Sequence, residues 1–418
     1  MKEKVRLISY ASLYSFSFVI AYIYFLNFHQ EYYGFEINVI TDYYIIFTFL
    51  ISLIPIYFYN GYKNISSGIS IFIYILLYVP TIFTFYFSLK SENHQEIYVN
   101  LIFCFSMCLF FLVDKINLKP ISIKQTILPI HVLVFTLLLT LYVLFIYRNN
   151  LRIVSFEDVY DLRRENDIYG KSIVEIYLSA WLYNVMLPLC LTFGIILKNK
   201  ISFIIGMVGC FVMYISTGSK AALLLPIIYI GIYFLIRNNY KQIFKNSLKY
   251  LSLIILFLTQ LEFSFFSSIL LSRTIGNGGL MTYKYFDFFS NNPNTYFSHI
   301  NIINKITNNY PYKDSMVGQV VGREYWGSTM NANANFWATD GLASLGLYGV
   351  PIISIIFCFF LIFLNSITRK QNQLFLLLCC LPFILNITNT SFFSSLLTGG
   401  GFLIVIFFMT QKTKYKLT

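Results

Sequence analysis

Long apolar runs separated by short polar segments follow one another along almost the whole chain. A helix that crosses the hydrocarbon core of a bilayer needs about 20 mostly apolar residues. The pattern therefore predicts an all-α polytopic membrane protein with about 12 transmembrane helices, and the count is open by one pair because several runs are short. The predicted spans are residues 5–28, 43–60, 69–89, 99–113, 127–147, 177–197, 201–216, 221–236, 250–272, 342–365, 374–392 and 395–410.

The composition agrees with this pattern. Hydrophobic residues make up 57% of the 418 residues and charged residues only 11%, whereas a soluble chain carries about 25% charged residues. This excludes a soluble enzyme, a disordered chain and a nucleic-acid-binding domain. All seven cysteines lie inside apolar runs, so neither a disulfide framework nor a zinc site is predicted.

Lysine and arginine gather in alternate connecting segments. With the N-terminus placed in the cytoplasm, the inside segments hold 18 basic and two acidic residues, and the outside segments hold 12 basic and 15 acidic residues. Positive charge marks the cytoplasmic side of membrane proteins, so both termini are predicted to be cytoplasmic and the net charge of +12 reflects topology. Glu262, inside the ninth predicted span, is either a functional group or the partner of another polar group in the helices.

Two predicted outer loops are much longer than a helix connection requires. Residues 148–176 and 273–341 separate three groups of spans: 1–147 with spans 1–5, 177–272 with spans 6–9, and 342–418 with spans 10–12 and a cytoplasmic tail. Loops longer than about 12–15 residues are usually functional or disordered. Because both loops contain aromatic residues throughout, we expect short amphipathic helices that lie on the outer leaflet and an extracytoplasmic working face.

Several cations in the outer segments could bind phosphate. Arg163 and Arg164 follow Tyr160 in the first long loop, where guanidinium groups could hold a pyrophosphate or pair with neighbouring acids on an interfacial helix. Lys220 ends a Ser-Thr-Gly-Ser-Lys turn and could bind an anion or extend towards water from the end of a helix. Arg273 begins the second long loop and is either a ligand of an anionic lipid head or an interface anchor.

The end of the second loop has the residue types that bind sugars. Amides hydrogen-bond hydroxyl groups and aromatic faces stack on sugar rings, and here Asn333 and Asn335 precede Trp337. Asp340 could deprotonate an acceptor hydroxyl or cap a helix. His299, the only histidine in either long loop, could act as the base near neutral pH or have no chemical role.

Four stretches together resemble the Wzy-type O-antigen or capsular polysaccharide polymerases, also called oligosaccharide repeat-unit polymerases. They are FEDVYDLRREN at 156–166, STGSKAALL at 216–224, LSRTIGNGGLMTYKYFDFFSNNPNTYFSH at 271–299 and MNANANFWATDGLASLGLYG at 330–349. The resemblance covers roughly residues 145–350, and the first 140 residues match only in hydropathy. Lys220 stands where many relatives have arginine, and Gly278-Gly279 stands where Pro-Gly is frequent.

The resemblance implies an inverting, metal-independent membrane glycosyltransferase of the GT-C-like class that needs no cofactor. Its donor would be a growing glycan on undecaprenyl pyrophosphate, and its acceptor would be a hydroxyl of one lipid-linked repeat unit. The bilayer and a chain-length regulator protein are further candidate partners, in the cytoplasmic membrane of a bacterium. A lipid-linked oligosaccharide flippase and an O-antigen ligase are the alternatives.

The same resemblance leads us to hypothesise roles for the candidate residues. Arg273 and Lys220 would lie at the departing pyrophosphate, where positive charge stabilises the leaving group. Either His299 or Asp340 would be the acceptor base. The remaining candidates are substrate-binding residues: Tyr160, Arg163, Arg164, Tyr283, Arg323, Asn333, Asn335 and Trp337.

Overall fold

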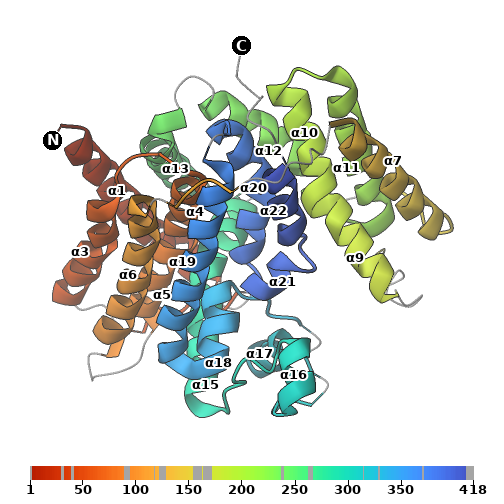
Figure 1. Cartoon of the computed structure of the whole chain (residues 1–418). Coiled ribbons are helices and arrows are strands. Elements are labelled where there is room, and N and C mark those ends of the chain that lie inside the picture. The colour runs from red at the N-terminus through yellow and green to blue at the C-terminus, as the bar shows by residue number, and fades with distance from the viewer. Residues whose placement is uncertain are drawn as a thin grey trace. The chain divides into compact units, whose positions relative to one another are not determined.

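The described part of the chain is built from helices and turns. The computed structural model describes residues 2–29, 33–38, 42–88, 95–116, 118–121, 129–153, 162, 172–236, 240–261, 267–313, 315–327, 330–369 and 371–410. No strand occurs within these ranges (Figure 1). The predicted all-helical class is therefore confirmed for them.

The chain folds into two compact units, each assembled from separate stretches of sequence. Unit 1 comprises residues 1–118, 241–363 and 384–393, and unit 2 comprises residues 119–240, 364–383 and 394–418. The helices of unit 1 are α1 (Lys2–Ala21), η1 (Tyr22–Leu26), η2 (Asn27–His29), α3 (Asp42–Phe58), α4 (Ile65–Ile73), η3 (Tyr74–Tyr78), α5 (Val79–Ser88), α6 (Gln95–Leu112), η4 (Val113–Lys115), α13 (Ile243–Thr259), η7 (Ser268–Gly276), α15 (Asn277–Asn291), α16 (Asn301–Thr307), α17 (Val317–Trp326), η8 (Trp337–Leu342), α18 (Ala343–Leu345), η9 (Gly346–Tyr348) and the first part of α19 (Gly349–Thr368).

Unit 2 contains the helices of the middle of the chain and most of the C-terminal part. They are α7 (Pro129–Ile146), α9 (Ile173–Trp181), η5 (Leu182–Met186), α10 (Leu187–Ile196), α11 (Lys200–Thr217), α12 (Lys220–Ile236), most of α20 (Gln373–Ile387) and α22 (Gly401–Thr410). The short η6 (Tyr240–Gln242) lies at the boundary between the units in sequence, and α21 (Phe392–Leu396) begins in unit 1 and ends in unit 2.

Seven helical stretches are long and apolar enough to cross a membrane, which is consistent with a polytopic membrane protein. They are Lys2–Leu26, Ile65–Ser88, Ile97–Lys115, Pro129–Ile146, Ile173–Ile196, Lys200–Thr217 and Trp337–Thr368. Four shorter apolar helices, at Tyr44–Phe58, Lys220–Phe234, Gln373–Ile387 and Gly401–Thr410, match four further predicted spans. The ninth predicted span, 250–272, overlaps α13 and η7, so the count of twelve stays a prediction.

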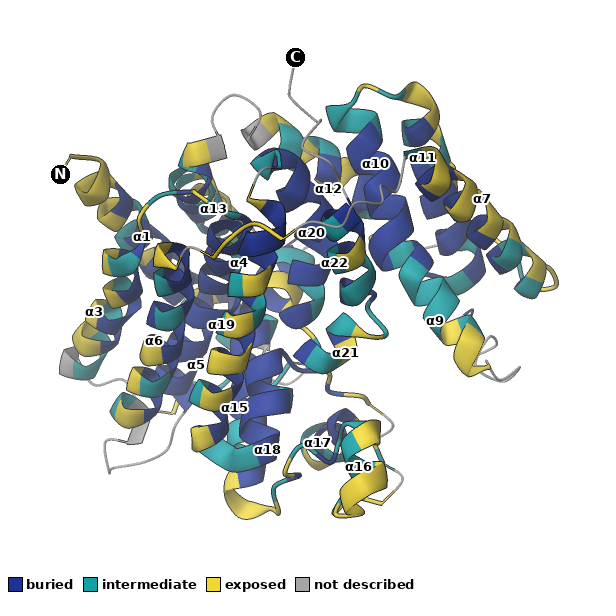
Figure 2. Ribbon diagram, in the orientation of Figure 1, coloured by how far each residue is buried: buried dark blue, intermediate teal, exposed yellow. Residues whose placement is uncertain are grey.

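The centre of unit 1 is the continuous helix α4–η3–α5. Nearly all of its residues are buried, as the dark blue ribbon of Figure 2 shows for this part of the unit. α15 packs along this helix because two residues face it without side chains, Gly278 towards η3 and Gly279 towards α5. A Cβ atom at Gly279 would lie 2.5 Å from the carbonyl oxygen of Pro80, so only glycine permits this approach.

The position of α15 corrects one expectation. The sequence placed this stretch in an outer loop, with short helices on the leaflet surface. Ten of the 15 residues of α15 are instead buried, among them Tyr283 and Lys284. Its neighbour α16 has no buried residue and resembles the expected surface helix. The first part of the second long loop thus belongs to the core of unit 1.

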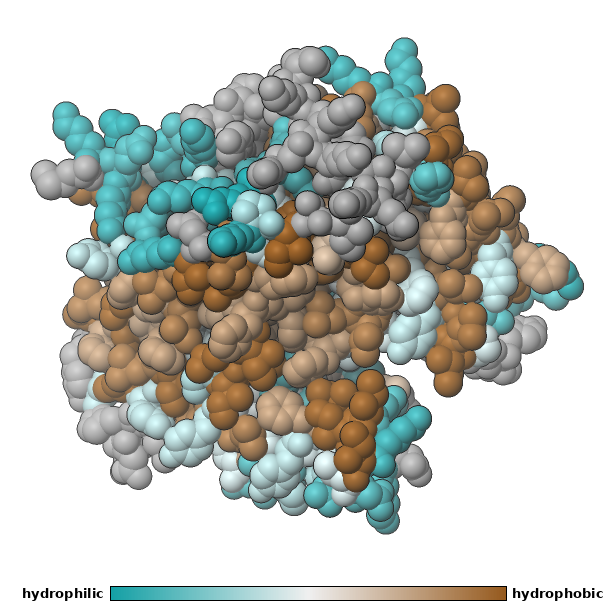
Figure 3. Space-filling view, viewed as in Figure 1, coloured by the Kyte–Doolittle hydropathy of each residue, from teal (hydrophilic) through white to brown (hydrophobic). Residues whose placement is uncertain are grey.

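The outward sides of several helices in unit 1 are apolar. Phe16, Leu50, Phe105 and Phe359 are each more than half exposed. In Figure 3, brown apolar side chains cover α3, α6 and the first part of α19, while teal polar side chains gather at the N-terminal end. An apolar outer surface that lacks protein neighbours is what a bilayer would cover.

Segments predicted on the same side of the membrane meet at the same end of unit 1. The N-terminal residues, the segment after α3 and the start of α13 line one cavity. At the other end, α15, α17 and α18 lie together, and Lys284 pairs with Glu36 from the first predicted outer loop (Figure 1). We call these the basic end and the α15–α18 end.

Candidate functional site

A histidine and an aspartate form a buried pair at the α15–α18 end. Nε2 of His299 lies 3.1 Å from Oδ1 of Asp340, with 8% of the histidine side chain and none of the aspartate side chain exposed. Nδ1 of His299 lies 3.1 Å from the hydroxyl of Thr295. Both ring nitrogens therefore have partners. The structure thus brings together His299 and Asp340, the two residues predicted as alternative bases.

Asp340 is held by a third segment of the chain. The hydroxyl of Ser391 donates to Oδ1 at 2.6 Å, and the backbone N–H of Phe392 donates to Oδ2 at 2.6 Å. Three donors including the imidazole satisfy an ionised carboxylate in a site without water contact. Asp340 thus caps α21 and keeps Nε2 of His299 protonated, which leaves Nδ1 as the basic nitrogen of the neutral ring.

The turn that carries His299 is conformationally strained. Tyr296 and Phe297 have φ angles of 50° and 63°, in the left-handed region that bulky residues avoid. Backbone hydrogen bonds hold them there, from Thr295 N–H to the carbonyl of Ala343 at 2.7 Å and from Tyr296 N–H to that of Ser344 at 3.1 Å. Strained residues that the surrounding structure fixes are concentrated at functional sites.

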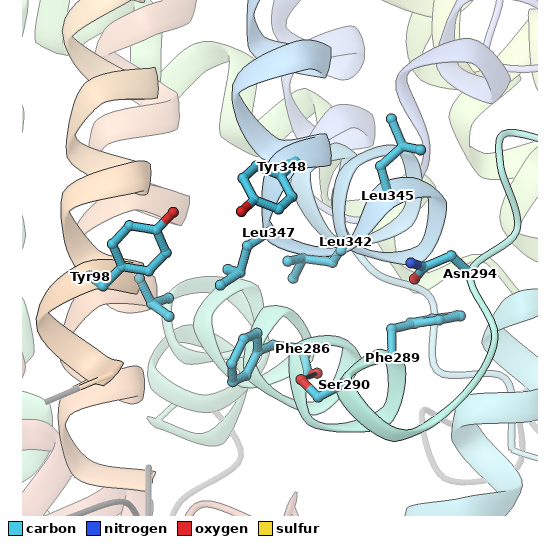
Figure 4. A pocket seen from close by; sticks show the side chains of 11 residues that line it. Tyr98, Phe286, Phe289, Ser290, Asn294, Leu342, Leu345, Leu347 and Tyr348 are labelled. Carbon is cyan, nitrogen blue, oxygen red and sulfur yellow. Dashed lines mark hydrogen bonds between the residues drawn. The ribbon is translucent and has the colours of Figure 1, made fainter. Parts of the chain in front are cut away.

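A pocket of about 570 Å³ lies at the same end of unit 1. Figure 4 shows side chains from α6, α15 and residues 342–348 that converge on it, with Asn294 beside them on the turn that leads to His299. Tyr98 and Tyr348 are 53% and 72% exposed, so their ring faces are open to a ligand. The pocket and the His299–Asp340 pair are therefore built from the same two segments.

Two polar side chains line this pocket. The side-chain oxygen of Asn294 is buried and has no hydrogen-bond partner among the described residues, although buried polar groups are normally paired. Ser290 adds a hydroxyl to the wall, which donates to the carbonyl of Phe286 at 2.6 Å and can still accept from a ligand. Aromatic faces together with an amide and a hydroxyl are the groups that bind sugar rings.

A second buried pair lies on α15. Nζ of Lys284 is 3.1 Å from Oε1 of Glu36, and the exposed fractions of the two side chains are 7% and 26%. The ammonium also lies 4.8 Å from the centroid of the Tyr325 ring, a distance at which cation–π attraction acts. The hydroxyl of Tyr325 donates to Asp287, also on α15. This network fastens the segment before α3 and helix α17 to α15.

Two predicted sugar contacts are used by the protein itself. Trp337 is fully buried, stacks on Phe110 and donates from its indole N–H to Ser354 at 2.9 Å. The amide oxygen of Asn335 accepts from the N–H groups of Trp337 and Ala338, which caps the start of η8. Its amide nitrogen donates to Thr282 at 2.7 Å. Neither side chain offers a face or a free donor, so we correct both to structural roles.

Asp340 needs a related correction. It lies inside the helical stretch that begins at Trp337, five residues before the predicted start of this span at 342. With no exposed surface and three donors, its carboxylate cannot touch an acceptor hydroxyl. Of the two side chains, only that of His299 retains exposed surface, 8% of it.

The other predicted residues have varied surroundings. Arg273 is exposed on η7, and Asn333 is exposed before η8. Arg323 is exposed on α17 and donates to Ser315. Tyr283 is buried, and its hydroxyl donates to the carbonyl of Ser88 at 2.8 Å, which makes it a packing residue here.

Lys220 begins α12 in unit 2 and is half-buried. Four candidates lie outside the described residues: Tyr160, Arg163, Arg164 and Glu262. Within the ranges that the structure describes, no three histidine, cysteine or acidic side chains are grouped as a metal site would require.

Sequence reasoning missed several residues of this site. Ser391 lies in an apolar stretch near the C-terminus, and Tyr98 lies near the start of the fourth predicted span. Nothing local distinguishes them, because their contacts come from chain segments far away in sequence. Asn294 could have been found from the sequence, because it ends a polar Asn-Pro-Asn turn five residues before the candidate base His299.

Neither protein-family models, nor curated proteins, nor solved structures gave a match to this chain.

Proposed function

We propose that this chain is a membrane polysaccharide polymerase whose reaction takes place at the α15–α18 end of unit 1. It transfers a growing glycan from undecaprenyl pyrophosphate to a hydroxyl of a lipid-linked repeat unit. The observation that carries the proposal is the His299–Asp340 pair, built from the same segments as a pocket with exposed tyrosine faces. Both segments belong to the stretches that resemble the Wzy-type polymerases.

The first task of the site is to take a proton from the acceptor hydroxyl. Asp340 fixes the imidazole of His299 and stabilises the imidazolium that forms, as the acid of a hydroxyl–imidazole–carboxylate triad does. Nδ1 now accepts from the Thr295 hydroxyl. An acceptor hydroxyl that replaces this group, or that passes its proton through it, reaches the same base. His299 is thus the proposed base and Asp340 its positioning residue.

The second task is to stabilise the departing pyrophosphate. The glycosyl bond to pyrophosphate already holds the free energy of the reaction, so the protein needs cations rather than a nucleotide site. Arg273, exposed next to the start of α15, is the proposed ligand in unit 1. Arg163 and Arg164 remain proposed for the second lipid carrier.

The third task is to hold the sugars. Tyr98 and Tyr348 provide exposed ring faces, and Asn294 provides an unpaired amide oxygen. They take the place of Asn335 and Trp337 in our proposal. The α15–α18 end then faces the outside of a bacterial cytoplasmic membrane, and both termini face the cytoplasm.

The test is a strain that lacks the gene, complemented with variants, in which the surface glycan is resolved by gel. The deletion should leave a single repeat unit where the parent strain has a ladder. His299→Gln should lower the yield of chains longer than one unit at least about a hundredfold, the usual effect of losing a general base. His131→Gln, a histidine change in α7, is the matched control and should restore the ladder.

Other results would point elsewhere. A complete loss of surface glycan, with lipid-linked repeats trapped on the cytoplasmic side, would identify a flippase. Full polymer retained on the lipid carrier would identify a ligase. A normal ladder in the His299→Gln strain would reject this site even if polymerisation itself were established.

A further inference from the structure

The basic end of unit 1 contains a second cavity, of about 260 Å³, far from the proposed reaction. Its walls come from the start of α1, from the segment that follows α3, and from η6 and the start of α13. These segments are far apart in sequence, and the fold brings them to one place. The cavity is lined by side chains that the proposed polymerase reaction does not use.

Positive charge dominates the walls of this cavity. Lys4 and Arg6 contribute from α1, and Lys241 and Lys245 contribute from the other side, against one carboxylate, that of Glu3. Other basic residues of the same predicted side, such as Lys63 and Lys115, do not line it.

Lys4 is already oriented at the rim of the cavity. Its Nζ donates to the carbonyl of Tyr57 at 2.8 Å and lies 4.1 Å from the centroid of that ring. An ammonium has three donors, so two remain for a ligand.

An uncharged donor is fixed in the same wall. Tyr59 lines the cavity, is 9% exposed, and its hydroxyl has no hydrogen-bond partner in the described part of the chain. Edge-on contacts with Phe111 and Phe244, at centroid distances of 5.5 and 5.0 Å, hold the ring. A phenol hydroxyl can donate one hydrogen bond to a ligand.

We propose that this cavity binds a phosphate group, with Lys4, Arg6, Lys241 and Lys245 as its cations. Two sources share this chemistry: the headgroup of an anionic phospholipid in the leaflet at this end, and a soluble phosphorylated compound. Basic pockets between helices at a membrane surface bind anionic headgroups in this way. The proposal does not depend on the polymerase activity.

The test uses the purified full-length chain in a neutral detergent. Thermal unfolding is followed with dioctanoyl phosphatidylglycerol, with dioctanoyl phosphatidylcholine and with inorganic phosphate. The anionic lipid should raise Tm and the zwitterionic lipid should not. Each cation near an anionic surface changes affinity about fivefold, so Lys241→Gln/Lys245→Gln should weaken the apparent Kd about 25-fold.

The matched control is Lys198→Gln/Lys200→Gln, which removes two exposed lysines outside the cavity and should leave the Kd unchanged. A Tm increase with inorganic phosphate that the cavity variant loses would support the site and identify the source as soluble. If the cavity variant binds the anionic lipid as tightly as the parent chain, or the control loses as much affinity, the proposal is wrong. If the cavity variant does not fold, Lys4→Gln/Arg6→Gln, on the opposite wall, decides by the same criteria.

Discussion

The α15–α18 end of unit 1 contains two pairs of basic and acidic side chains that differ in kind. Lys284 and Glu36 join an ammonium to a carboxylate, and the side chain of Glu36 is 26% exposed to solvent. In the other pair, the imidazole of His299 meets the carboxylate of Asp340, which is fully buried and accepts from two further donors. One pair fastens segments together, and the other has the composition of a proton-transfer unit.

This difference shows that burial alone does not mark a site. Both pairs join residues distant in sequence, and both lie at the same end of the unit. What separates them is the neighbourhood, because Lys284 is surrounded by tyrosine rings of its own fold. His299 follows a strained turn that also contributes Asn294 to an open pocket. The following variants separate the two roles.

Asp340→Ala should have the largest effect. It removes the acceptor of three hydrogen bonds and leaves His299, Ser391 and the N–H of Phe392 without their partner. A buried donor left without an acceptor costs about 1–3 kcal/mol, so losing the acceptor of three donors should lower the free energy of unfolding by roughly 3 kcal/mol or more. An SDS titration of the purified protein measures this loss, and the glycan ladder should disappear with it.

Asp340→Asn separates the two consequences. The amide keeps an acceptor for Ser391 and much of the packing, but it cannot stabilise an imidazolium. We expect this variant to regain most of the lost stability and little of the polymerisation. Recovery of both together would mean that the pair is only a structural clamp.

Gly279→Ala should come next, and it affects both pairs because α15 carries Lys284 and leads into the turn of His299. The new methyl carbon would lie 2.5 Å from the carbonyl oxygen of Pro80, and overpacking of this kind destabilises by about 1–3 kcal/mol. Gly231→Ala, where nothing lies within 4 Å, is the matched control and should lose no stability in the same SDS titration. Equal behaviour of the two variants would show that α15 does not need this close approach.

The sequence predicted the class of the protein better than its site. Apolar runs reveal spanning helices because a bilayer requires them wherever they pack. The burial of α15 could not be predicted in the same way, since it depends on glycines that meet one particular partner, the continuous helix η3–α5. Hydropathy gives no information about such partners.

The candidate residues show the same limit. His299 and Asp340 could be named from residue type and loop position, but their mutual contact, 41 residues apart, could not. Trp337 and Asn335 looked like sugar contacts because aromatic and amide groups serve both packing and binding. Only the fold shows that these side chains already bind within the protein. Trp337 contacts α6 and α19, and Asn335 caps η8.

Lys284→Met should have a smaller effect, and mainly on stability. It leaves the Glu36 carboxylate without its cation, but solvent reaches that group, so the loss should be about 1–2 kcal/mol in the SDS titration. The double variant Glu36→Leu/Lys284→Met should recover most of it, as apolar replacement of a buried pair often does. The glycan ladder should remain in both, and its loss would contradict the division of roles between the two pairs.

Tyr325→Phe should have the smallest effect on stability. It removes the hydroxyl that donates to Asp287 beside Lys284, and the pH dependence of stability reports this contact. Burial, and then the hydrogen bond to Asp287 and its charge, raise the pKa of Tyr325 above its ordinary value near 10. Above pH 10 the unfolded chain loses this proton while the folded chain keeps it, so the stability contributed by Tyr325 is complete below pH 10 and decreases as the pH rises.

Removing the hydroxyl should lower the free energy of unfolding by about 1 kcal/mol at pH 8 and make its decrease between pH 10 and 11.5 less steep. Tyr310 and Tyr312, whose pKa values burial raises to about 12, keep part of that slope in the variant. An unchanged slope in thermal unfolding scans would mean that Tyr325 is not held in this network, and Lys284 would then be fastened by Glu36 alone.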